Sequence, residues 1–222
     1  MRIMVKVSHA IDAFSERLGN VSVYLVILTF FVGFSNVVLR YAGRFIGRRL
    51  TSNVFIEIQW YLYSLIFFFG FAYILKNGIN VRVDFWFANL PKKTQAKIDF
   101  VGHILALIPF TMLGIWAVWN PVLTSWGMRQ SDGTWRAWAD AVELSNNFLG
   151  RIGLFLQHIP NYWELSPDPN GLPRAPIKTM ALLAFITLFL QAISEMVKLY
   201  AILTDQEHLV ETAKLDAPIR IE

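Results

Sequence analysis

The chain has 222 residues, of which 55% are hydrophobic and only 16% are charged, and its mean hydropathy is +0.44. A soluble domain carries about a quarter charged residues, so this composition predicts a membrane protein. The formal charge of +4 comes from groups that flank apolar runs and form no single basic face, which argues against nucleic-acid binding. The absence of cysteine excludes disulfide scaffolds, thiol catalysis and metal or iron–sulfur sites with cysteine ligands.

The first 18 residues predict an amphipathic helix. A cleaved signal peptide is not expected, because Asp12 and Glu16 interrupt this segment and the apolar run after it is of full spanning length. We expect helix 1–18 to lie on the membrane surface or to dock against a partner. Its apolar side chains recur every three or four positions and are Ile3, Val7, Ile11, Phe14 and Leu18.

Two apolar runs, 19–40 and 55–76, are each long enough to cross about 30 Å of hydrocarbon, and they predict the first two membrane-spanning helices. The second run begins near Glu57 and Trp60 and carries aromatic residues at both ends, where amphipathic rings favour the headgroup level. Small residues on these runs permit close packing between helices. They are Gly33, Ser35, Gly70 and Ala72.

The third and fourth spans are predicted at 91–120 and 177–203. Pro109 lies inside the third span and predicts a kink, because proline removes a backbone hydrogen bond. The fourth span begins at Lys178 and becomes polar near its end, where Glu195 can pair with the lysine three residues later.

Four spans place both termini on the same side of the membrane. Lys and Arg are in excess on that side once the central arginines of the longest loop are set aside, which predicts cytoplasmic termini. The connection 77–90 and the tail 204–222 are then cytoplasmic, and the connection 121–176 lies on the outer side.

Two of the connections carry patterns of their own. Residues 79–87 alternate apolar and polar side chains, which favours extended chain with Arg82 and Asp84 on one face, either as a solvated ion pair or in contact with a protein. The connection 121–176 is too long for a plain loop, and its segment 137–159 predicts one amphipathic helix at the outer interface, followed by proline-rich turns.

The ionisable groups near the spans lie toward span ends. Their leading interpretation is snorkelling or structural pairing, and the alternatives are an ion path or a contact with another subunit. A haem held by two histidines needs imidazoles at membrane depth, and only His103 lies close to a span. The sequence contains no catalytic triad, phosphate-binding loop or metal-spaced carboxylate pair. We therefore expect an all-α integral membrane protein without a cofactor, as a subunit of a larger assembly.

Residues in the second span, the connection after it and the third span resemble a known family in their order and spacing. These residues are Glu57, Trp60, Gly70, Ala72, Val81, Arg82, Val83, Asp84, Leu90, Pro91 and Asp99. The pattern resembles the small membrane subunit of tripartite ATP-independent periplasmic (TRAP) transporters, most clearly over residues 10–120. The long outer loop ending at Pro176, Ile177 and Lys178 is similar to a longer-looped branch of that family.

The resemblance implies a complex in the bacterial inner membrane. Its other components are a large permease subunit, which binds substrate and sodium, and a soluble periplasmic protein, which captures an organic acid. The present chain would then be a scaffold without catalytic activity that braces the large subunit, and its outer loop would help to dock the binding protein.

No residue is predicted to be catalytic or to bind substrate or metal. The predicted structural or subunit-interface positions are Glu57, Trp60, Gly70, Arg82, Asp84, Lys178 and Glu195. The alternatives are a small four-helix membrane redox protein, which would show a cofactor spectrum, and a stand-alone carrier, which would transport when reconstituted alone.

Overall fold

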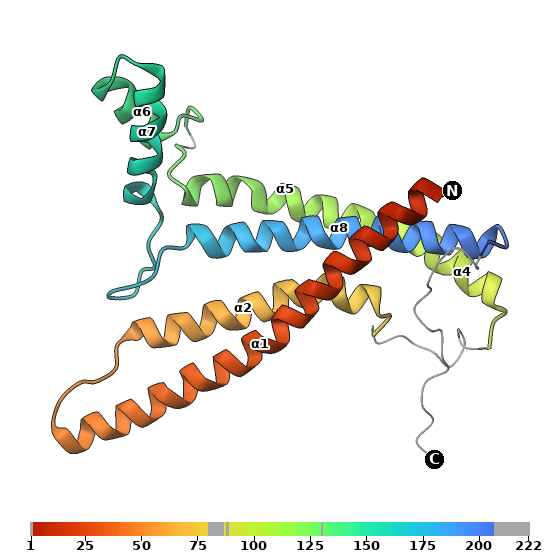
Figure 1. The fold of residues 1–222 in the computed structure, drawn as a ribbon, viewed down its shortest axis with the longest axis horizontal. Helices are drawn as coiled ribbons and strands as arrows, with labels where there is room; N and C mark the ends of the chain where they lie inside the picture. The colour runs from red at the N-terminus through yellow and green to blue at the C-terminus, as the bar shows by residue number, and fades with distance from the viewer. Residues whose placement is uncertain (1, 80–86, 88, 130, 207–222) are drawn as a thin grey trace. The chain divides into compact units, whose positions relative to one another are not determined.

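The computed structural model describes all residues except 1, 80–86, 88, 130 and 207–222. The described chain is helical, and Figure 1 shows the order of its elements. The helices are α1 (Arg2–Ile46), α2 (Asn53–Lys76), α4 (Lys92–Gly102), a π-helical turn (His103–Leu107), α5 (Ile108–Ser125), α6 (Arg136–Leu144), α7 (Phe148–His158), a 3₁₀ turn (Ile159–Tyr162) and α8 (Ala175–Leu203).

Among the described residues, four helical segments are long and apolar enough to cross a membrane: Ile3–Ile46, Asn53–Lys76, Lys92–Ser125 and Ala175–Leu203. The predicted all-α membrane fold with four spans is therefore confirmed. The chain divides into two compact units. The terminal unit comprises Met1–Val23, Phe67–Gly114 and Ala184–Glu222, and the loop unit comprises Tyr24–Ile66 and Ile115–Leu183.

The predicted amphipathic helix 1–18 and the predicted first span 19–40 form one continuous helix, α1, of 45 residues. Hydropathy changes near residue 18, but a change in hydropathy does not break a helix. Gly19 does not break it either, because this residue is packed: a Cβ there would lie 2.2 Å from the Tyr73 ring. Helix α1 ends at Ile46, and the next residue, Gly47, has a φ of +71°, the left-handed conformation that glycine adopts after helix ends.

The third span contains a π-helical turn, His103–Leu107, directly before Pro109. In this turn the Ile108 N–H donates to the His103 carbonyl, five residues back. The ring of a proline crowds the carbonyl four residues earlier, and the wider π-helical turn accommodates it. The predicted perturbation at Pro109 therefore takes the form of a change in hydrogen-bond register.

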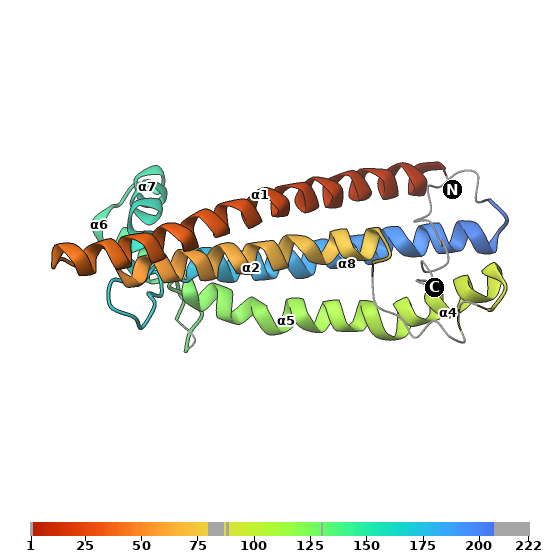
Figure 2. The ribbon, with the colours of Figure 1, turned by 90° about the horizontal axis from the view of Figure 1, so that it is seen from below.

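The prediction of one amphipathic helix over 137–159 is wrong, because the segment forms two helices, α6 and α7, which lie side by side (Figures 1 and 2). Ser145 and Asn147 between them are extended, and the Ser145 Oγ accepts a hydrogen bond from the Asn147 N–H at 3.3 Å. Such local bonds compete with helical ones. The small side chains of Ala137 and Ala141 are buried where the helices pack.

The expected extended segment 79–87 falls almost entirely on residues that the structure does not describe. Arg82 and Asp84 lie outside the described residues, as does most of the predicted tail 204–222. Their predicted roles therefore stay predictions.

Candidate functional site: two polar anchors

The first part of α1 packs on the protein through small and polar residues. Asp12 and Gly19 lie on the buried face of this segment, whereas the apolar residues Ile3, Val7 and Phe14 are exposed. In a membrane protein, small residues let helices approach closely while apolar side chains can face lipid. The exposed apolar face stays consistent with the predicted surface or partner contact. The buried face consists of Val5, Ser8, Asp12, Ser15 and Gly19.

This face of α1 lies on the last part of α8 (Figures 1 and 2). The Ser8 and Ser194 hydroxyl oxygens are 2.7 Å apart, and the Ser15 hydroxyl donates to the Gln191 Oε1 at 2.7 Å. Gln191 and Ser194 are fully buried. These polar contacts therefore join two segments that are far apart in the sequence.

A buried group of charges lies at the centre of this contact. The Lys198 Nζ is 2.9 Å from the Asp12 Oδ2 and 2.7 Å from the Glu195 Oε1. The Asp12 Oδ1 accepts hydrogen bonds from the Gln191 Nε2 at 2.8 Å and the Ser194 Oγ at 2.7 Å. We call the set Ser8, Asp12, Ser15, Gln191, Ser194, Glu195 and Lys198 the polar clamp.

The polar clamp is suited to holding α1 in place. The Lys198 side chain is only 5% exposed, and its ammonium contacts two carboxylates. Removing one member of such a buried set leaves its partners without compensation, which is strongly destabilising. A second ion pair in the same unit joins the Lys76 Nζ to the Glu16 Oε2 at 2.5 Å and so links α2 to α1.

The sequence predicts the pairing of Glu195 with Lys198 but not the contribution of α1. The missed residues are Ser8, Asp12, Ser15, Gln191 and Ser194. A signal for them exists in the sequence, because polar residues recur at spacings of three and four on both segments, as they do on one face of a helix. The sequence contains no signal that tells which two faces meet.

The loop unit contains a second polar anchor, on α2. The Glu57 carboxylate accepts a hydrogen bond from the Leu172 N–H, and the Tyr61 hydroxyl donates to the Pro173 carbonyl at 3.1 Å. Glu57 is buried although it is charged. These two side chains hold the segment 164–174, which precedes α8.

The segment 164–174 forms a closed turn. The Ser166 N–H donates to the Leu172 carbonyl at 3.1 Å, and the Arg174 N–H donates to the Glu164 carbonyl at 2.7 Å. The Glu164 carboxylate pairs with Lys178 in the first turns of α8. We call Glu57, Tyr61, Glu164 and Lys178 the loop anchor. Glu57 and Lys178, which are far apart in the sequence, thus hold the same turn.

The remaining predicted positions have different surroundings. Trp60 is 60% exposed, on the surface of α2. A Cβ at Gly70 would meet only the Ile74 side chain of its own helix, at 3.8 Å, so no close helix crossing occurs there within the described residues. In contrast, Ala72 is fully buried, and a Cβ at Gly33 would lie 2.5 Å from the Gln59 Nε2.

Helices α6 and α7 carry a hydrogen-bonded pair of their own. The Tyr162 hydroxyl, just after α7, donates to the Asp140 carboxylate of α6 at 2.5 Å. This bond favours the protonated phenol and raises the pKa of Tyr162. The Trp138 ring packs edge-on against Phe155, with centroids 5.7 Å apart. The two helices therefore form a compact hairpin.

Among the described residues, no group of three or more His, Cys, Asp or Glu is placed to hold a metal ion. His103, the histidine closest to a predicted span, lies in the π-helical turn, and its Nδ1 is 2.6 Å from the Asp99 carbonyl.

Comparison with known proteins gives one family. The family described as "Tripartite ATP-independent periplasmic transporters, DctQ component" matches residues 28–201. The matched range begins within α1, ends within α8 and covers most of the chain. No curated protein and no solved structure matches the chain.

Proposed function

Because this chain belongs to the DctQ component family of tripartite ATP-independent periplasmic transporters, which are transport proteins and not enzymes, we propose that it is a scaffold that braces a large permease subunit. The complete system would be a sodium-coupled symporter for organic acids in the bacterial inner membrane, with a periplasmic substrate-binding protein as its third component. Substrate and sodium would be bound by the two partners.

The observation that carries the scaffold proposal is an apolar stripe on α1. Its members are separated by three or four residues in alternation, the heptad spacing with which one helix packs along another. Each is at least 50% exposed. The stripe consists of Ile27, Phe30, Phe34, Val37 and Tyr41.

The burial of the spans supports the same proposal. None of the most apolar 18-residue window of α1 is buried within the chain, whereas 39% of the corresponding window of α8 is buried. Helix α8 therefore has the character of a core helix and α1 that of an outer helix. A heptad-spaced apolar surface on an outer membrane helix suits a partner helix, and we propose that this partner helix belongs to the large subunit.

The two polar anchors fit this role, because they connect elements within the chain. The polar clamp joins α1 to α8, and the loop anchor joins α2 to the segment before α8. We propose that Glu57, Lys178 and Glu195 act in keeping this subunit rigid and that Trp60 contacts the partner or lipid. We also propose Arg82 and Asp84 as interface positions, and this proposal rests on the family resemblance alone.

We further propose that α6 and α7 help to dock the binding protein on the periplasmic side, with both termini in the cytoplasm. Helix α7 exposes Leu149 and Leu156, seven residues apart and thus on one face. Exposed apolar residues on a folded hairpin outside the spans are typical of a contact surface.

Site-directed cross-linking tests the scaffold role, because the chain has no cysteine and an introduced one is unique. The variants Ile27→Cys and Phe34→Cys lie on the stripe. Their matched controls, Leu28→Cys and Ser35→Cys, are also exposed but are turned by about 100° around the helix. With a thiol-directed photo-cross-linker, which inserts into nearby C–H bonds when illuminated in native membranes, we expect adducts with a large polytopic permease from the two stripe positions only.

Equal adduct yields from stripe and control positions would contradict the stripe as the interface. Gentle solubilisation and co-purification of the unaltered chain provide the wider test. Recovery of the chain alone, under conditions where other membrane complexes survive, would refute the subunit proposal itself.

A further inference from the structure

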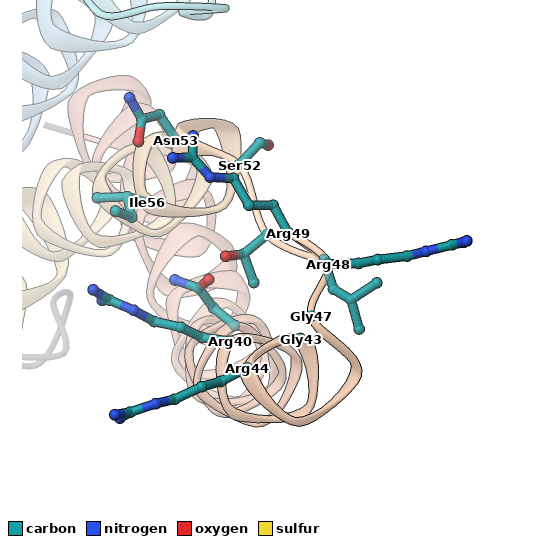
Figure 3. A pocket seen from close by; sticks show the side chains of 12 residues that line it. Arg40, Gly43, Arg44, Gly47, Arg48, Arg49, Ser52, Asn53 and Ile56 are labelled. Carbon is teal, nitrogen blue, oxygen red and sulfur yellow. The ribbon is translucent and has the colours of Figure 1, made fainter.

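The connection between α1 and α2, in the loop unit, forms a hollow of about 660 Å³ with four arginines among its 12 lining residues (Figure 3). None of the lining residues is acidic. Within the described part of the chain, no Asp or Glu forms an ion pair with any of these arginines. The hollow therefore concentrates positive charge that the described residues do not neutralise. The arginines are Arg40, Arg44, Arg48 and Arg49.

The backbone builds this arrangement. Gly47 has a φ of +71°, and the Arg48 N–H donates to the Gly43 carbonyl at 3.0 Å, which is the hydrogen bond of a Schellman motif. A Cβ at Gly43 would lie only 2.5 Å from the Arg48 carbonyl oxygen, so the glycine lets the chain turn back closely over the end of α1. The turn thus brings the backbone of Arg48 and Leu50 back against Gly43.

The four arginines do not point the same way. Arg40 and Arg44 are one helical turn apart on α1, and their side chains extend in the same direction in Figure 3. The Arg49 side chain reaches back toward the start of α2, in the direction of Asn53. The Arg48 side chain also lines the hollow but points the opposite way. Arg40, Arg44 and Arg49 therefore extend toward one side of the hollow, and Arg48, which extends toward the other side, serves as a natural control.

The chemistry of the lining indicates a phosphate group. Guanidinium groups bind phosphate oxygens through paired, charge-assisted hydrogen bonds. Neutral side chains in the lining, Thr51, Ser52 and Asn53, supply additional hydrogen-bond donors. Near the arginines, α1 exposes Tyr41 and Phe45, residues typical of the level where a membrane helix meets lipid headgroups.

We propose that this hollow binds the phosphate of an anionic membrane phospholipid, with Arg40, Arg44 and Arg49 as its ligands. The position of the hollow favours a lipid over free phosphate, because it lies at the end of an apolar span and beside exposed aromatic residues, where lipid headgroups are expected. Anchoring at this point would fix the position of the α1–α2 connection relative to the bilayer. The proposal depends neither on the side of the membrane on which the connection lies nor on the scaffold role.

Native mass spectrometry of the full chain, purified with any partner that stays bound, tests the site. The probe is dioleoylphosphatidylglycerol, titrated against the unaltered chain and against Arg40→Gln, Arg44→Gln, Arg49→Gln and Arg48→Gln. A hydrogen bond between charged groups contributes a factor of about ten or more in affinity, so we expect each of the first three variants to weaken the tightest lipid site at least about tenfold. Arg48→Gln, which removes the same charge but no direct contact, should weaken it by no more than the factor of about five that diffuse attraction contributes.

Each alternative has its own outcome. An equal loss in Arg48→Gln would show diffuse attraction by net charge and would overturn the site. Displacement of the lipid by inorganic phosphate at millimolar concentration would assign the hollow to free phosphate and overturn the lipid assignment. Unchanged lipid binding together with loss of a co-purifying protein in Arg40→Gln or Arg44→Gln would assign the arginines to a protein contact and also overturn the proposal.

Discussion

Replacing Lys198 by methionine removes the cation that Asp12 and Glu195 share in the polar clamp. The ammonium makes two charge-assisted contacts, of 2.9 and 2.7 Å, and the three side chains are only 5%, 12% and 14% exposed, so that solvent screens them little. Breaking a buried ion pair by removing one partner costs about 3–5 kcal/mol. We take about 3 kcal/mol, because one carboxyl group can relieve part of the cost by binding a proton.

A cost of about 3 kcal/mol raises the equilibrium constant for release of the first part of α1 by more than about a hundredfold. Ser15, which is 1% exposed beneath Gln191, allows this opening to be measured. In a Ser15→Cys background, the introduced thiol is unique, and its rate of reaction with a maleimide reports the fraction of chains in which α1 has left α8. A cysteine introduced at the exposed position of Ala13 gives the rate for open chain.

We expect Lys198→Met to accelerate the labelling of the thiol at position 15 by about two orders of magnitude, up to the rate at position 13. The matched control is Lys93→Met, because Lys93 pairs with Asp205 through side chains that are 56% and 73% exposed. Exposed pairs contribute about 0–1 kcal/mol, so the control should change the rate only slightly. Equal rates in the two variants would refute the conclusion that the clamp holds α1.

Three further predictions concern the loop unit. Glu57→Ala leaves the Leu172 N–H in the 164–174 turn without its partner, which costs about 1–3 kcal/mol. Limited proteolysis of this turn should therefore be faster in the variant, and an unchanged rate would contradict the loop anchor. Gly127→Ala should lower the melting temperature more than Gly133→Ala. Both glycines have positive φ, so an alanine at either position costs about 1–2 kcal/mol in backbone strain, but only at position 127 would the new Cβ also clash, 2.7 Å from the Tyr162 Cβ. The hydrogen bond to Asp140 is the main cause of the raised pKa of Tyr162, and it stabilises the hairpin. This stabilisation is complete below a pH of about 10 and is lost as the pH rises through the raised pKa. Alkaline titration of hairpin stability should therefore show a difference from Tyr162→Phe that disappears at high pH, and a difference that persists there would contradict it.

The sequence was sufficient for the spans and the fold class. A run of about 20 apolar residues has few alternatives to a membrane helix, since every backbone polar group must be paired within the hydrocarbon, and this local rule applies to each span independently. The resemblance to the family also rested on the sequence alone, and the family match confirms it. Local rules were less successful where two structures compete, as at 145–147, where side-chain hydrogen bonds divide one predicted helix into α6 and α7.

Only the tertiary structure decided which polar residues act together. Asp12 and Lys198 lie at opposite ends of the sequence, and periodicity places each on a helix face without indicating which faces meet. The same holds for Glu57 and the turn before α8. The apolar face of the first part of α1 was evident from the sequence, but it is the small and polar face that packs on the protein. Apolar side chains in a membrane gain little by leaving lipid, whereas buried polar groups must find partners. The sequence alone thus determined what kind of protein this is, and packing determined which of its charges hold it together.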